Sequence, residues 1–198
     1  MNNSITSTSF GAHINTKIKG RNNVMKNITE EFSKRTKDMQ GELNIFRDRE
    51  YPSSICFTTQ NKDSGCLITG DYKDIMAEKT GKHTPEEQSK IVTKLINLFK
   101  ILNQEVSTKC NLKPIDSDIT RRQKLLNEHR FNASKCIDIK LKSAFEKLQE
   151  IDTKVLNRLE AQRQEIVDKS CDIIDGYAGN DETLKMYSNI VREDQYKI

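Results

Sequence analysis

The sequence has no run of 18 consecutive apolar residues, and no apolar stretch follows the basic residues near its start. The first absence excludes a transmembrane helix, and the second excludes a cleavable secretory signal. Apolar residues make up only 34% of the chain and charged residues 31%, a balance typical of long, thin helical proteins. The sequence therefore predicts a helical protein without a membrane span, cytoplasmic where it is synthesised.

Recognisable chemical motifs are also missing. The five cysteines include no Cys-x-x-Cys pair, and their odd number argues against a disulfide framework, so we expect reduced thiols. No cysteine or histidine lies two to five residues from another, as structural metal sites usually require. A dinucleotide fingerprint, a Walker-type loop and a calcium loop are absent as well. We therefore expect neither a metal nor a cofactor.

Acidic residues are absent from the first 29 positions, which carry four basic residues. Positions 30–198 then hold 29 basic and 29 acidic residues, so the net charge of +4 comes from the start of the chain. Proteins that bind phosphate backbones usually concentrate basic residues on a folded face. Nucleic acid is therefore an improbable partner.

Long amphipathic helices dominate the predicted fold. Apolar residues at intervals of three, four or seven predict a first helix over 22–51, which ends before Pro52. A second helix begins at Pro85, where Thr84 and Glu87 form a capping box, and it ends near residue 110 because Pro114 follows.

The stretch 115–175 contains neither glycine nor proline. It is either one helix, whose end pairs with a second chain as a coiled coil, or two bundle helices separated near 129–135. Gly179 and Asp181 then separate a short last helix. The expected fold class is an all-α bundle of three to five long antiparallel helices, with a disordered leader over 1–21 and a single domain over 22–198.

Residues 52–83 form an irregular insertion in this bundle. Two short runs, Ile55–Thr59 and Cys66–Thr69, flank a polar turn and predict a small β-hairpin. Cys56, Cys66 and His83 fall within the insertion and are the candidates for a catalytic cysteine–histidine site, with His129 as another histidine that could serve Cys56. No nucleophile turn or flanking signature supports this enzyme hypothesis.

Two helical surfaces are candidate binding sites. On the helix over 137–177, apolar residues and flanking charges of both signs suit docking on another helix, and the candidate stripe consists of Leu148, Ile151, Val155 and Leu159. Packing inside the bundle explains the same stripe equally well. Arg121, Arg122, Lys124 and Arg130 form a basic band that is a candidate anion site or simply a solvated face.

The first twenty residues, MNNSITSTSFGAHINTKIKG, are polar, rich in Ser, Thr, Asn and Ile, and free of acidic residues. In these respects they resemble the uncleaved N-terminal export signals of bacterial type III secretion substrates. The resemblance implies a bacterial protein that is exported without a cleavable signal. A frayed terminus is the alternative.

These observations lead to a hypothesis with one alternative. The chain is a non-enzymatic helical interaction module. It binds a protein partner or a second copy of itself through its long helices. In a bacterium it would act as a secreted effector or a secretion-associated protein. The alternative is a small enzyme built around residues 52–83.

Overall fold

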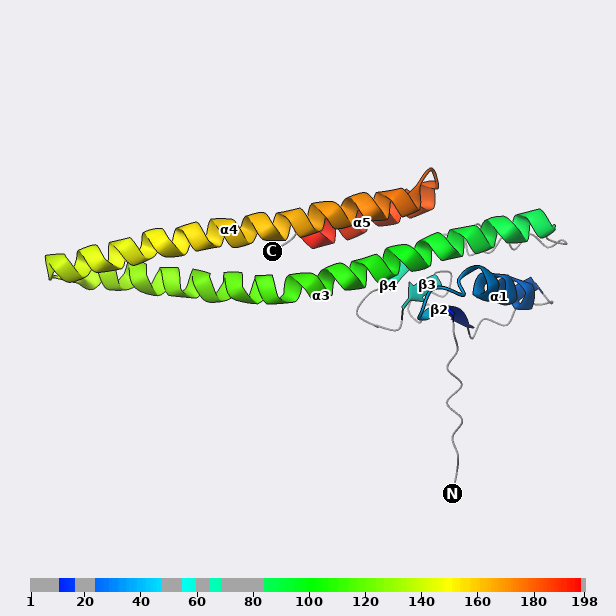
Figure 1. Cartoon of the computed structure of the whole chain (residues 1–198), viewed down its shortest axis with the longest axis horizontal. Coiled ribbons are helices and arrows are strands. Elements are labelled where there is room, and N and C mark those ends of the chain that lie inside the picture. Colours follow the sequence, from blue (N-terminus) through cyan, green and yellow to red (C-terminus); the bar gives the residue numbers. More distant parts are fainter. Residues whose placement is uncertain (1–10, 17–23, 48–54, 60–64, 69–83, 197–198) are drawn as a thin grey trace, which may run out of the picture. The chain divides into compact units, whose positions relative to one another are not determined.

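The computed structural model describes residues 11–16, 24–47, 55–59, 65–68 and 84–196. They are mainly α-helical, as expected: the helices are α1 (Val24–Arg35), α3 (Pro85–Lys135), α4 (Ile139–Ala178) and α5 (Glu182–Tyr196) (Figure 1). The strands β1 (His13–Thr16), β2 (Glu42–Arg47), β3 (Ile55–Thr58) and β4 (Gly65–Ile68) form one sheet. Two compact units divide the chain: a first unit of residues 1–106 and 177–187, and a second unit of residues 107–176 and 188–198.

The sheet of the first unit has the strand order β1-β2-β3-β4. Strands β3 and β4 pair antiparallel, which confirms the hairpin predicted within residues 52–83. The hairpin is not isolated, because β2 pairs antiparallel with β3 and places Ile45 opposite Phe57, both fully buried. The insertion is thus one edge of a larger sheet; its residues 52–54, 60–64 and 69–83 lie outside the described part of the chain.

The prediction of a single helix over 22–51 is wrong. Helix α1 ends at Arg35, and the hydroxyl of Thr36 then donates to the carbonyl oxygens of Phe32 (2.7 Å) and Ala12 (3.2 Å). Gly41 follows in the left-handed region with φ of 126°, and β2 begins at the next residue. Leu43 and Ile45 are buried while their neighbours are more exposed, so the true period is two, and the helical spacing of Leu43 and Phe46 from Phe32 was coincidental.

The expectation that residues 1–21 are disordered throughout is also wrong in part. Residues His13–Thr16 form β1, which pairs parallel with β2. Ala12 and Ile14 are buried in the core of the first unit, and the Ala12 amide donates to the Thr36 carbonyl at 3.2 Å. Burial of these apolar side chains offsets the conformational entropy that the segment loses when it becomes ordered. Residues 1–10 and 17–21 lie outside the described structure.

The first part of α3 covers the sheet and α1 within the first unit (Figure 1). The predicted capping box is confirmed: the Glu87 amide donates to Thr84 Oγ1 at 3.2 Å, and the Thr84 amide donates to Glu87 Oε2 at 2.9 Å. The helix then buries apolar residues on more than one side, as predicted, and the rings of Phe32 and Phe99 meet edge to face at 5.9 Å. Its buried residues are Ile91, Val92, Leu95, Ile96, Leu98, Phe99, Ile101 and Leu102.

In the second unit α3 and α4 run antiparallel as a long hairpin. The predicted end of a helix near residue 110 is wrong, because α3 passes through Pro114 and ends at Lys135. The cost of this proline is tolerable because Pro114 is exposed, so water can satisfy the carbonyl that its missing N–H leaves unbonded, while Leu112 and Ile119 continue the buried stripe. The chain then turns at residues 136–138, which confirms the alternative of two helices.

The end of α4 follows the sequence prediction in part. Gly179 adopts a left-handed φ of 54° directly after the helix, whereas Gly176 lies inside it. Asp181 then caps α5, since its Oδ1 accepts the Leu184 amide at 3.0 Å. Glycine at the first position and a carboxylate at the second are the residues that such helix ends favour.

Two glycine substitutions should have opposite effects on stability. At Gly41 an added Cβ would lie 3.1 Å from the buried Phe99 ring, in a backbone conformation that alanine disfavours. We expect Gly41→Ala to lower the free energy of unfolding by about 2 kcal/mol or more.

The matched control is Gly176→Ala, where no atom lies within 4 Å of the added Cβ and the backbone is helical. This variant should gain about 0.5–1 kcal/mol because alanine is the better helix former. Urea denaturation followed by circular dichroism measures both. Equal effects of the two substitutions would contradict the role given to Gly41.

Candidate interaction surface

The α3–α4 hairpin is held by two apolar clusters in the second unit. Leu112 packs with Val167 and Cys171, and Ile119 packs with Leu126 and Leu156. Buried polar contacts lie between and beside these clusters. Thr108 and Ser170 share a hydrogen bond of 2.6 Å, and the nearly buried Arg163 donates from Nε to Asp116 at 2.8 Å.

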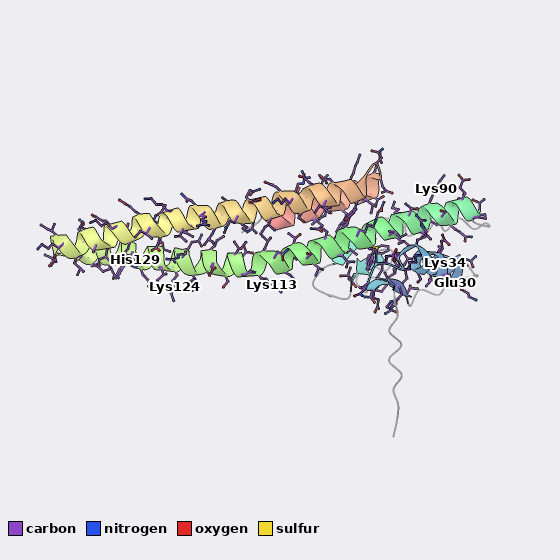
Figure 2. The ribbon with its side chains drawn as sticks, in the orientation of Figure 1. Glu30, Lys34, Lys90, Lys113, Lys124 and His129 are labelled. Carbon is purple, nitrogen blue, oxygen red and sulfur yellow. The ribbon has the colours of Figure 1, made fainter. Side chains whose placement is uncertain are left out.

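Near its closed end the hairpin contains a buried carboxylate. Asp152 on α4 is 3% exposed. One of its oxygens accepts a hydrogen bond from Arg122 Nη1 at 2.7 Å, and the other lies 2.8 Å from His129 Nδ1; both partners are on α3. His129 also faces the ring of Phe145 with 6.2 Å between centroids. Figure 2 shows His129 near the turn, between the two ribbons. Charge-assisted hydrogen bonds of this kind offset the desolvation of the carboxylate.

Sequence reasoning did not identify Asp152, because it placed the buried stripe of α4 on the wrong residues. The buried residues of α4 are Asp152, Leu156, Arg163, Val167, Ser170, Cys171, Ile174 and Ala178. Three of them carry hydroxyl or charged groups, so a buried face inferred from the spacing of apolar residues does not include them. These polar residues recur at helical spacing on α4, and α3 offers oppositely charged partners in Asp116 and Arg122. That combination could have indicated the buried face.

Two residues of the predicted stripe, Ile151 and Val155, come one position before the buried Asp152 and Leu156. Leu148 is 41% exposed and Ile151 is 53% exposed, whereas Val155 and Leu159 are half-buried. Leu159 packs partly against the cluster of Ile119. The α4 row, defined as Leu148, Ile151, Val155 and Leu159, therefore starts on the surface and descends toward the core.

The first half of α4 thus has an inverted polarity. Where the helix faces α3 it places Asp152, and one residue away it exposes Ile151. A helix that packs on only one neighbour normally does the opposite. An exposed apolar row beside a polar interior is typical of a helix that also contacts a binding partner outside its own hairpin.

The predicted basic band does not assemble into one anion site. Arg122 pairs with Asp152, and Arg121 pairs with Asp118 at 3.0 Å, so carboxylates already offset two of the four charges. Lys124 and Arg130 are exposed. Lys124 points away from α4 on the outer side of α3, as does Lys113 (Figure 2).

The two cysteines of the candidate cysteine–histidine site lie on adjacent strands but are not paired with each other. Cys56 on β3 is opposite Leu67, and Cys66 on β4 is opposite Phe57, so the two cysteines are not cross-strand partners. His83 lies outside the residues that the structure describes. Within the described ranges no group of three or more His, Cys, Asp or Glu residues could hold a metal ion.

Comparison with known proteins adds no function. The sequence matches no protein family, and neither a curated protein nor a solved structure is significantly similar to it. Among the residues placed by the structure, no helix has the length and apolarity needed to cross a bilayer.

The buried carboxylate gives a prediction on stability. Asp152→Asn keeps the shape of the side chain but leaves only one accepting oxygen for Arg122 and His129, and its amide group would face a second donor. We expect the free energy of unfolding to fall by about 2–4 kcal/mol, because breaking a buried ion pair leaves its partner uncompensated.

The matched control is Asp118→Asn on the exposed pair with Arg121, which should change stability by no more than about 0.5 kcal/mol. Urea denaturation of both variants measures the difference. If the two substitutions had equal effects, Asp152 would not anchor the hairpin.

The thiols give a second prediction. Burial raises the pKa of the Cys171 thiol, and the nearby Arg192 lowers it by less. Since the thiolate is the reactive form, Cys171 should react with a disulfide reagent at least about tenfold more slowly than the exposed Cys110 at neutral pH.

Labelling of Cys110→Ser and Cys171→Ser variants assigns the two rates. Equal rates for Cys110 and Cys171 would contradict the expected burial. A thiol assigned to Cys56 or Cys66 that reacts fast well below pH ~8 would instead support the enzyme alternative.

Proposed function

We propose that the protein is a non-enzymatic helical interaction module that associates through the α4 row. The observation that carries this proposal is the inverted polarity of α4, with Asp152 inside and Ile151 outside. The spacing of Leu148, Ile151 and Val155 by three and four residues is the pattern with which one helix docks on another.

A second copy of this chain is the occupant that the charges favour. Because Asp152 is buried, the exposed side chains of residues 145–158 are three basic and two acidic ones, so the surroundings of the row are close to neutral, at +1. A neutral surface does not repel its own copy, and a two-fold interface places the same patch on both partners. The exposed Lys147, Glu150 and Lys154 beside the row can then pair across the interface.

Export from a bacterium extends this proposal and is supported by the composition of residues 1–20 alone. Because β1 takes up His13–Thr16, part of this segment also belongs to the sheet. A bacterial effector or secretion-associated role therefore has weaker support than association through α4. The enzyme alternative is addressed by the thiol measurement.

Light scattering on the full chain over a wide concentration range tests the association. We expect a concentration-dependent dimer, and we expect Leu148→Asp combined with Ile151→Asp to raise its dissociation constant at least about tenfold, because two apolar anchors are replaced by like charges.

The control is Ile173→Asp combined with Ile190→Asp, which introduces the same number of charges at exposed isoleucines of the second unit outside the row. This variant should dimerise normally, and circular dichroism should show that both variants keep their helix content. A monomer at every concentration would contradict self-association. A dimer that both variants weaken equally would contradict the assignment to the α4 row.

A further inference from the structure

The closed end of the α3–α4 hairpin is the most exposed apolar part of the described chain. We define the hairpin tip as residues 130–142, which include the end of α3, the turn at 136–138 and the start of α4. Ile137 is 97% exposed and Ile139 is 83% exposed. Phe131 and Leu141 are also exposed and complete the apolar part of the tip. Such side chains contribute nothing to the hairpin core, so fold stability does not account for them.

Basic side chains alternate with these apolar ones. The tip contains Arg130, Lys135, Lys140 and Lys142 but only one acidic residue, Asp138, which gives a local charge of +3 in 13 residues. All four basic residues are exposed. The Lys135 ammonium lies 5.8 Å from the centroid of the Phe131 ring, so a cationic group and an apolar group lie side by side on the surface.

The single acidic residue of the tip is engaged by the fold. Asp138 Oδ1 accepts the backbone amides of Lys140 at 2.8 Å and Leu141 at 3.1 Å, and it thereby caps α4. Its negative charge compensates the helix N-terminus. The tip therefore presents positive charge and apolar side chains to its surroundings.

We propose that the hairpin tip binds an anionic lipid surface, with Ile137, Ile139, Leu141 and Phe131 entering the interfacial region. The charge favours this partner: +3 attracts anionic headgroups and repels a second copy of the same tip, in contrast to the nearly neutral α4 row. The shape favours it too, because nearly complete exposure of Ile137 and Ile139 means that they project from the turn, and a deformable bilayer accepts a projecting end without a matching groove.

The alternation of residues suits this arrangement. Ile139 and Leu141 are each followed by a lysine, whose long apolar stem can lie along the lipid while its ammonium reaches the phosphates. The binding is peripheral, in keeping with the absence of a bilayer-spanning helix among the described residues.

Vesicle flotation of the full chain tests this proposal. The probes are vesicles of phosphatidylcholine alone and of phosphatidylcholine with about 30% phosphatidylserine. We expect binding to the anionic vesicles at least about tenfold stronger than to the neutral ones, and weaker binding as salt is raised above about 0.15 M.

Two pairs of variants separate the apolar and the charged contributions. Ile137→Asp with Ile139→Asp should weaken binding at least about tenfold, while its control, Ile173→Asp with Ile190→Asp, should bind like the unmodified chain. Lys140→Glu with Lys142→Glu should also lose at least about tenfold, while Lys113→Glu with Lys169→Glu, at exposed positions outside the tip and the α4 row, should lose much less.

The outcomes that overturn the proposal are distinct. Equal binding to both vesicle types would exclude anionic recognition, and equal losses in test and control variants would exclude the tip. No binding to either vesicle would also overturn it and would leave an acidic protein surface as the occupant. Leu148→Asp with Ile151→Asp should leave vesicle binding nearly unchanged, so failure of this proposal and failure of the proposed dimer are told apart.

Discussion

The contact of Asp152 with Arg122 and His129 fixes how α3 and α4 pair, and much of the second unit depends on it. Two long apolar helix faces can slide past each other by one turn, about 5.4 Å, with only a modest loss of packing. A carboxylate that is 3% exposed cannot follow such a slide, because it would lose both of its partners in a medium that does not solvate it. The contacts Thr108–Ser170 and Asp116–Arg163 require the same register along the rest of the hairpin.

The same register determines which side of α4 faces outward. Once Asp152 points at α3, Ile151 lies about 100° away around the helix and faces away from that contact. Exposure of Ile151 is therefore a consequence of the buried polar contact and not a separate feature. This coupling explains why an apolar stripe and a true core face coexist on one helix.

Local signals in the sequence predicted those elements whose cause is local. The capping box of Thr84 and Glu87, the hairpin over β3 and β4, and the left-handed Gly179 followed by the Asp181 cap depend on residues within a few positions of one another. The errors lie where distant contacts decide. Whether α1 continues beyond Arg35 depends on Thr36 meeting Ala12, and whether α3 survives Pro114 depends on the packing of Leu112 and Ile119 against α4. Only part of the candidate site could be predicted from the sequence. The spacing of Leu148 and Ile151 identified them, but Asp152 was missed because nothing in the sequence alone shows that a charged residue is buried.

The α4 row and the hairpin tip differ in chemistry although both expose apolar side chains. Around the row, exposed charges of both signs nearly cancel, while around the tip four basic residues surround a single aspartate that is already used as a cap. A surface that repels its own copy cannot be the centre of a symmetric dimer, whereas a neutral one can. The row begins at Leu148, seven residues after Leu141 at the end of the tip, so the two surfaces do not overlap. Because the row and the tip are separate surfaces, pairing through the row leaves the tip exposed, and neither contact requires the other.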